Sequence, residues 1–251
     1  MKKCLIRSRI TLISMLVLIV ASLGACSLLS VPNITSAGNN KIVNLGDSIF
    51  ALSGKISDYL HSYAGKTFRR YATSGAEIEG ASIVTSFDVY SQYATAKSHY
   101  TPIETIFMDG GGNDILIPAV AFDPYNCKKD WWESSLSSTC KDLIDDVYVD
   151  TVNLLNQMGR DGVQNIIFLG YYNLKNGLIG STSLNTAVNY GDARLAAAVA
   201  NATAASNNRM FIDPRPYIVS SDITFDGVHP SDSGARKLAD LIWTKLGVLP
   251  Y

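Results

Sequence analysis

Two short segments contain residue types that together could form a nucleophile and its base. Ser48 ends the sequence Gly46-Asp47-Ser48, which follows an apolar segment where a helix is predicted to begin. A serine at a helix N-terminus lies near free N–H groups that favour negative charge, which suits a nucleophile whose attack creates an oxyanion. Asp226 and His229 precede the last predicted helix, and histidine is the usual general base when a carboxylate orients it. Taken singly, Ser48 could be an ordinary N-cap and His229 a surface residue.

Two further segments could donate hydrogen bonds to the same oxyanion. Gly75 follows the second predicted strand, and glycine lets its backbone N–H approach a ligand closely. Asn113 follows the third predicted strand, and its side-chain amide could donate as well. Glycine and asparagine are also ordinary turn residues, so neither segment is sufficient alone. Asp47 and Asp114 are predicted to hold the turns in which they lie.

The elements that must position these segments alternate between strand and helix. Apolar segments predict strands at 41–45, 67–71, 103–108, 163–169 and 210–212. Helical spacing of apolar residues predicts helices at 49–60, 87–94, 143–158, 192–205 and 235–246. This alternation indicates a parallel sheet with helices on both faces. Ligands of such sheets bind beyond the carboxyl ends of the strands, where the first three segments lie.

Together the four segments resemble the SGNH branch of the GDSL hydrolase family. Gly46-Asp47-Ser48 matches the first family block, with Ile49 in place of the usual leucine, and Gly75 matches the second. The G-x-N-D block matches residues 111–114, and the D-x-x-H block matches residues 226–229. The blocks occur in the family order and span nearly the whole predicted mature chain.

The resemblance implies a three-layer α/β/α sandwich with a five-stranded, mostly parallel, flavodoxin-like sheet. It also implies a serine ester hydrolase that forms an acyl-enzyme without a cofactor or metal. Ser48 would be the nucleophile, with His229 as general base and Asp226 orienting it. The N–H groups of Ser48 and Gly75 and the Asn113 amide would form the oxyanion hole. A carbohydrate O-acetylesterase or acyltransferase would use the same residues, and a non-enzymatic surface lipoprotein could keep the same fold.

Other classes fit the sequence poorly. With 21 Lys+Arg against 22 Asp+Glu, the net charge of −1 gives no broad reason to expect a nucleic-acid partner. The sequence around Ser48 is not a G-x-S-x-G elbow, and Ile115 stands where a dinucleotide-binding loop needs its third glycine. The chain has three histidines, of which His61 and His99 are interpreted as helix-face residues. A small-molecule, lipid or acylated-glycan ester remains as the expected partner of a monomer.

The N-terminus is predicted to direct export. Basic residues at positions 2, 3, 7 and 9 precede an uncharged segment at 10–23, the pattern of a secretory signal, although a retained membrane anchor would look similar. Leu23-Gly24-Ala25-Cys26 resembles a bacterial lipobox, so residues 1–25 would be removed and Cys26 lipidated. Cleavage near Ala25 to give a soluble product is the alternative. Residues 26–40 are predicted to be a tether and 41–251 the hydrolase domain, in the periplasm, at the outer membrane or secreted.

Cys127 and Cys140 are the remaining cysteine pair of a predicted exported protein. Such a pair indicates a disulfide, which would contribute about 3 kcal/mol by closing its loop, although two free thiols are the alternative. The surrounding segment 118–140 is predicted to be irregular and to overhang the cleft.

Aromatic residues in two places could bind the substrate. Trp131 and Trp132 lie within the cysteine loop and could form a platform for an acyl or sugar group, or pack on the loop itself. Tyr171 and Tyr172 follow the fourth predicted strand. Tyr171 is predicted to line the cleft, with core packing as the alternative for one of the two.

Overall fold

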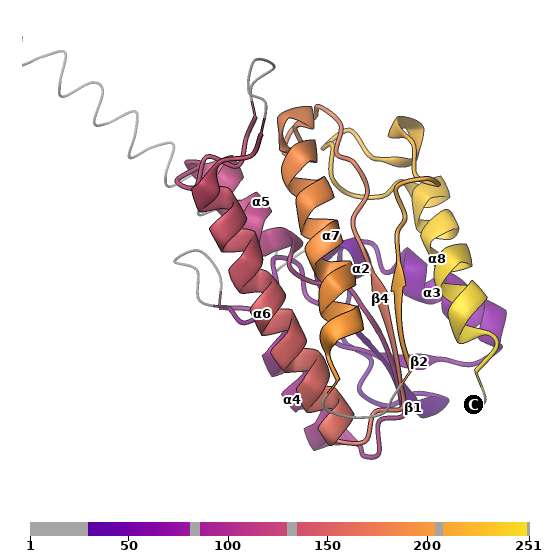
Figure 1. Ribbon diagram of the computed structural model, residues 1–251. Coiled ribbons are helices and arrows are strands. Elements are labelled where there is room, and N and C mark those ends of the chain that lie inside the picture. The colour runs from indigo at the N-terminus through magenta and orange to yellow at the C-terminus, as the bar shows by residue number, and fades with distance from the viewer. Residues whose placement is uncertain (1–29, 81–85, 130–134, 204–207, 250–251) are drawn as a thin grey trace, which may run out of the picture.

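The computed structural model describes residues 30–80, 86–129, 135–203 and 208–249 of the 251-residue chain. Within them one sheet has the strand order β2-β1-β3-β4-β5, and each neighbouring pair is parallel (Figure 1). The strands are β1 (Asn39–Leu45), β2 (Phe68–Arg70), β3 (Thr105–Met108), β4 (Asn165–Leu169) and β5 (Asn208–Ile212). This order is the flavodoxin-like one, so the predicted α/β fold is confirmed.

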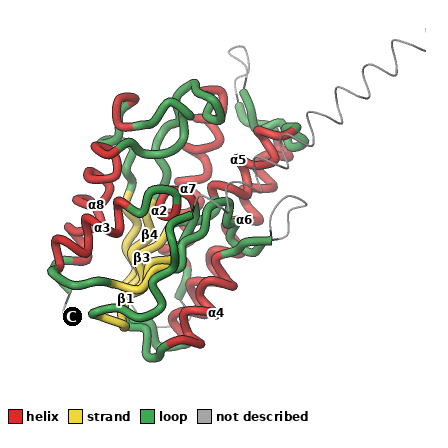
Figure 2. Tube along the Cα trace, turned by 180° about the vertical axis from the view of Figure 1, so that it is seen from behind, coloured by secondary structure: helices red, strands yellow, loops and turns green. Residues whose placement is uncertain are grey.

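Helices cover both faces of the sheet because the strands are apolar on both sides (Figures 1 and 2). They are α2 (Ser48–Ala51), α3 (Lys55–Ala64), α4 (Val89–His99), α5 (Gly112–Ala121), α6 (Ser138–Arg160), α7 (Asn185–Asn201) and α8 (Asp232–Leu246). Ile42 and Phe107 face a core formed with α2, α3 and α8. Their neighbours Val43 and Ile106 face a second core, formed with α4, α6 and α7. The turns that follow the strands therefore lie at one edge of a rigid, doubly covered sheet.

Several helix boundaries differ from the predictions. The helix predicted at 49–60 is two helices, α2 and α3, because the chain breaks at Gly54, whose φ of 67° is left-handed. Helix α7 begins at Asn185 rather than at residue 192, directly after a 3-10 turn at Thr182–Leu184. Gly159 does not end α6, which continues to Arg160.

The segment predicted to be irregular at 118–140 is helical at both ends. Helix α5 includes Pro118 and ends at Ala121, and α6 begins at Ser138 after the N-cap Ser137. Both ends of the segment are helical because a third apolar cluster buries them. Ala119 of α5 packs in this third cluster with the N-terminal parts of α6 and α7. Packing in this cluster outweighs the cost of a proline inside the helix.

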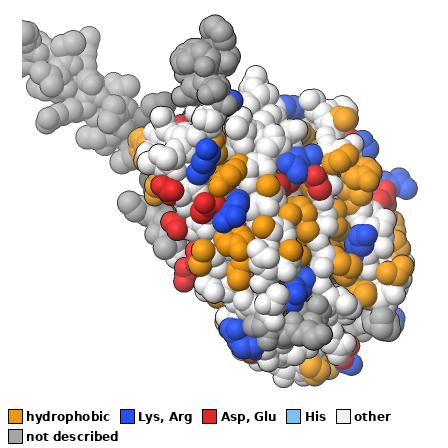
Figure 3. Space-filling model, viewed as in Figure 1, with side chains coloured by type: hydrophobic (Ala, Val, Ile, Leu, Met, Phe, Trp, Pro, Cys, Tyr) orange, Lys and Arg blue, Asp and Glu red, His pale blue; other side chains and the backbone are white. Residues whose placement is uncertain are grey.

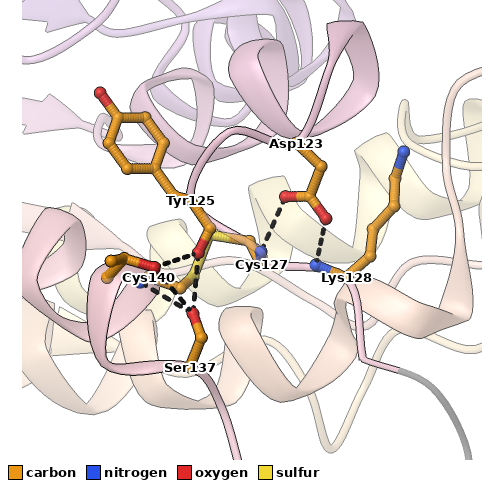
Figure 4. The surroundings of a disulfide bond; sticks show 7 residues. Asp123, Tyr125, Cys127, Lys128, Ser137 and Cys140 are labelled. Carbon is orange, nitrogen blue, oxygen red and sulfur yellow. Dashed lines mark hydrogen bonds between the residues drawn. A yellow bond between two sulfur atoms is a disulfide. The ribbon is translucent and has the colours of Figure 1, made fainter.

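The predicted disulfide between Cys127 and Cys140 is present, and both cysteines are buried in the third cluster (Figure 4). Short hydrogen bonds hold the chain around it. Ser137 Oγ donates to the carbonyl of Tyr125 at 2.7 Å. The carboxylate of Asp123 accepts from the Cys127 N–H at 2.7 Å and from the next residue's N–H at 3.0 Å. The disulfide thus ties the end of α5 to the start of α6.

Residues at the end of the predicted tether contact the domain. Ile34 exchanges two backbone hydrogen bonds with Arg70, each 3.0 Å long, and the Val31 N–H donates to the Ala51 carbonyl at 2.8 Å. Ser30 Oγ accepts from the N–H of Ser74 at 2.9 Å. The chain is therefore fixed to the domain from Ser30 onward, close to the turns that follow β1 and β2.

The surface over α6 and α7 mixes charged and apolar side chains. In Figure 3, Lys and Arg side chains lie among Asp and Glu on this face, with apolar side chains between them. None of the helices in the described part of the chain is long and apolar enough to span a membrane.

Candidate active site

The turn after β1 presents the Ser48 hydroxyl. Asp47 is the N-cap of α2, and its Oδ1 accepts from the Ile49 N–H at 2.9 Å. Because Asp47 caps the helix, Ser48 is its first residue and its hydroxyl is not used for capping. The alternative interpretation of Ser48 as the N-cap is therefore wrong.

The loop before α8 brings Asp226 and His229 to Ser48. His229 Nε2 lies 2.9 Å from Ser48 Oγ, and His229 Nδ1 lies 2.8 Å from Asp226 Oδ2. The other carboxylate oxygen of Asp226 accepts from the N–H groups of Val228 and His229, at 2.8 and 3.0 Å. Burial alone would raise the pKa of Asp226, but the hydrogen bonds from His229 and the backbone hold this pKa well below its ordinary value. Asp226 is thus an ionised acceptor that orients the His229 ring.

The turns after β2 and β3 meet through Asn113. Its side-chain Nδ2 donates to the carbonyl of Ala76 at 3.0 Å, which uses one of two amide protons. Gly75, the neighbour of Ala76, faces open space, because a Cβ built there would meet no atom within 4 Å. No hydrogen bond among the described residues uses the Gly75 N–H. The backbone N–H of Gly75 and the second amide proton of Asn113 are therefore free to donate.

Asp114 holds the same two turns together. Its carboxylate accepts from the Ile78 N–H, at 3.1 Å for the nearer oxygen. Burial, together with the neighbouring charge of Glu77, raises the pKa of Asp114 to about 7. This contact accords with the structural part predicted for Asp114.

Tyr171 connects the Ser48 turn to the Asn113 turn, a link that the sequence analysis missed. Its hydroxyl donates to Asp47 Oδ2 at 2.6 Å and accepts from the Gly112 N–H at 3.0 Å. A Cβ at residue 112 would lie 2.6 Å from Cζ of the Tyr171 ring. The glycine at the variable position of G-x-N-D is thus needed for the contact with Tyr171. This glycine is the one feature of the sequence that indicates the contact. Burial and the charge of Asp47 raise the pKa of Tyr171 well above its ordinary value, so the hydroxyl remains a donor.

Asp109, which the sequence analysis did not name, lies behind the Ser48 turn. Its Oδ1 accepts from the Asp47 N–H at 2.7 Å, and the side chain is 1% exposed. Burial and the nearby carboxylate of Asp47 raise the pKa of Asp109 well above its ordinary value. Asp109 thus supports the turn as a buried acceptor for the Asp47 N–H.

An apolar cavity of about 70 Å³ opens beside Ser48 and Asn113. Tyr171 lines it, as predicted, and so does Tyr172, which is buried and donates to the Val228 carbonyl at 2.6 Å. Trp131 and Trp132 lie outside the described residues, as does Cys26. In the described part of the chain, no group of three or more His, Cys, Asp or Glu side chains could hold a metal ion.

Comparisons with known proteins place this arrangement in a family. The model of the GDSL-like lipase/acylhydrolase family matches residues 42–242. A search of curated proteins finds no match.

The fold is similar to that of several solved structures. An aryl esterase from M. smegmatis is 12% identical with a TM-score of 0.57, covering 83% of this chain and 99% of its own. An acetyl xylan esterase from Geobacillus stearothermophilus is 16% identical with a TM-score of 0.55, covering 87% and 99%. A member of the lipolytic G-D-S-L family from Veillonella parvula is 16% identical with a TM-score of 0.54, covering 83% and 98%. Because the family model spans most of the sequence, including all four blocks, the chain belongs to the GDSL-like lipase/acylhydrolase family.

Proposed function

We propose that this ester hydrolase acts through an acyl intermediate on Ser48. The observation that carries the proposal is the continuous hydrogen-bonded chain from Ser48 Oγ to His229 Nε2 and from His229 Nδ1 to Asp226. With Asp226 ionised, the ring proton lies on Nδ1, and Nε2 is free to accept the serine proton.

The reaction follows from this geometry in two halves. His229 accepts the proton of Ser48 as Oγ attacks the ester carbonyl, and then gives it to the departing alcohol. Water then attacks the acyl-Ser48, with His229 again as the base. In both halves the oxyanion receives hydrogen bonds from the N–H groups of Ser48 and Gly75 and from the Asn113 amide, and one such donor contributes about 10²–10³ in rate.

The test is the removal of the nucleophile. Ser48→Ala should leave a folded protein whose hydrolysis of p-nitrophenyl acetate falls by about 10⁴-fold or more. A fluorophosphonate probe should label the native protein and not this variant. Ser53→Ala is a matched control, because Ser53 lies five positions away and is exposed; it should keep both activity and labelling. Normal turnover by a purified Ser48→Ala protein would exclude Ser48 as the nucleophile.

We further propose that the protein is exported and lipidated on Cys26. The charged N-terminus and the lipobox-like sequence support this, and so does the Cys127–Cys140 disulfide, since disulfides persist in oxidising compartments. Ser30 is fixed to the domain, and the backbone from Cys26 to Ser30 can span at most about 14 Å. The lipid would hold the turn that carries Gly75 close to a membrane surface. An intact mass showing a native N-terminus other than lipidated Cys26 would reject this second proposal and leave the esterase proposal unchanged.

A further inference from the structure

We propose that the cavity beside Ser48 binds the acyl chain of the substrate, and that the preferred ester carries an unbranched chain of medium length. This inference rests on the proposed function and adds the substrate class. The cavity lies between α5, α6 and α7, which are close to one another in Figure 1, and the Ser48 turn forms its catalytic end.

The lining residues show which side of the ester the cavity receives. Ser48 and Asn113 line it, whereas His229 does not. The leaving oxygen must lie at His229 Nε2 to receive its proton, so the alcohol part of the ester points toward His229. The acyl part then extends from the Ser48 and Asn113 side, into the cavity.

The walls of the cavity are suited to a hydrocarbon chain. They consist mainly of aliphatic side chains from three helices, such as Ile115 of α5, Ile144 of α6 and Leu195 of α7. Most polar side chains among the described lining residues have partners, but Asp192 Oδ2 is buried without a hydrogen bond, 3.4 Å from Arg215 Nε. Asp192 accepts from the Tyr171 N–H at 2.8 Å, and Asn113 and Tyr172 donate to backbone carbonyls.

The polar residues that line the cavity at the protein surface also have partners. Arg194 Nε lies 2.7 Å from Asp145 Oδ1, and Tyr148 Oη accepts from Asn201 at 3.1 Å. A sugar in the cavity would bury most of its hydroxyl groups without hydrogen-bond partners, which costs far more than burying methylenes. An acyl chain has no such requirement.

Tyr148 of α6 and Arg194 of α7 close the cavity between the two helices. Both line it and both are partly exposed, and the Arg194 guanidinium lies 4.0 Å from the centre of the Tyr148 ring. Val147 and Leu195, next to them in sequence, are buried on the inner side. The α7 residues that line the cavity run from Ala187 to Leu195, about 12 Å at the usual rise per residue, which leaves room along the helix for a chain of about eight carbons.

The chain-length profile tests this assignment. For p-nitrophenyl esters from acetate to dodecanoate, kcat/KM should rise about 3- to 4-fold per methylene, as expected for burial in an apolar site. It should stop rising near octanoate, where the cavity ends. A profile that is highest at acetate, or faster turnover of acetylated xylan than of octanoate esters, would overturn the inference.

Two variants should move the profile in opposite directions. Gly191 lines the cavity, and a Cβ there would lie 3.7 Å from Ile115 Cδ1, so Gly191→Leu should fill the cavity. The octanoate-to-acetate ratio should then fall about 30-fold, the effect of about three lost methylenes. Tyr148→Ala should remove the outer closure and raise the dodecanoate-to-octanoate ratio about 10-fold. Ala193→Leu is the control, because Ala193 is an exposed residue of the same helix outside the cavity lining; its ratios should equal those of the native protein.

Failure of this inference can be distinguished from failure of the proposed function. If the native protein hydrolyses acetate esters and is labelled on Ser48, but the folded variants leave the ratios unchanged, only the acyl site is refuted. If no ester is hydrolysed and Ser48 is not labelled, the proposed function fails and the acyl site with it. If Gly191→Leu does not fold, the chain-length profile of Tyr148→Ala still tests the acyl site. An unchanged profile would refute the closure of the cavity by Tyr148.

Discussion

Removing the Tyr171 hydroxyl should weaken both the fold and the catalytic turns. The hydroxyl lies between the Asp47 carboxylate and the Gly112 N–H, at 2.6 and 3.0 Å. A hydrogen bond to a charged group contributes about 1.5–3 kcal/mol, and a buried polar group left without a partner costs about 1–3 kcal/mol. Asp47 is 2% exposed, so its oxygen would have little access to water. Tyr171→Phe should therefore lower the free energy of unfolding by about 2–4 kcal/mol.

The same change should affect turnover more than substrate binding. Phenylalanine keeps the ring that lines the cavity but no longer joins the turn of Ser48 to that of Asn113. Because a displacement of about 1 Å at a reacting group costs about 10²-fold, kcat for p-nitrophenyl acetate should fall about 10- to 100-fold, with KM changed less than about 3-fold.

A tyrosine of similar chemistry on the surface provides the control. Tyr63 donates to Asp240 at 2.7 Å in an exposed position, so Tyr63→Phe should change stability by less than about 0.5 kcal/mol and leave kcat unchanged. Urea unfolding and steady-state kinetics on both variants check the prediction. If Tyr171→Phe behaved like Tyr63→Phe in both measurements, the proposed link between the two turns would be wrong.

Two further predictions concern carboxylates. Asp226→Asn should lower kcat by about 10⁴-fold with little change in KM, because asparagine no longer fixes the His229 tautomer; a loss below about 10-fold in steady-state assays would contradict this. The pKa of Asp114 is about 7 in the folded state against 3.8 when unperturbed, so between these values the folded protein holds a proton that the unfolded chain has lost. Stability should therefore fall as pH rises through this window, and Asp114→Asn should remove a slope of up to about 1.4 kcal/mol per pH unit, as measured by urea unfolding at about pH 5 and about pH 7.

The sheet could be predicted from the sequence because its strands are short apolar segments between polar turns. β4, at Asn165–Leu169, is fully buried, so its sequence is a short apolar segment that is easily assigned to a strand. The helix ends could not be predicted as well. Helix α7 begins at Asn185 because its first residues pack in the cluster around the disulfide, a long-range contact that no local periodicity records.

The candidate site shows the same division between local and long-range information. Ser48, Asn113 and His229 could be named from the sequence because each lies in a short motif with its own turn chemistry. Asp226 could be named from the sequence because it lies three positions before His229. The support provided by Asp109 was not found, since it reaches Asp47 from the turn after β3, 62 positions away.

Gly112 shows that a long-range contact can determine which residue a motif contains. The family block leaves this position open, yet a side chain there would collide with the Tyr171 ring. Tyr171 in turn contacts Asp47, 124 positions earlier in the chain. The residues proposed to perform the chemistry can therefore be named from local patterns, whereas the contacts that hold them in place are seen only in the folded chain. Gly112, Tyr171 and Asp47 form one such set, and a change at any of the three should disturb the other two.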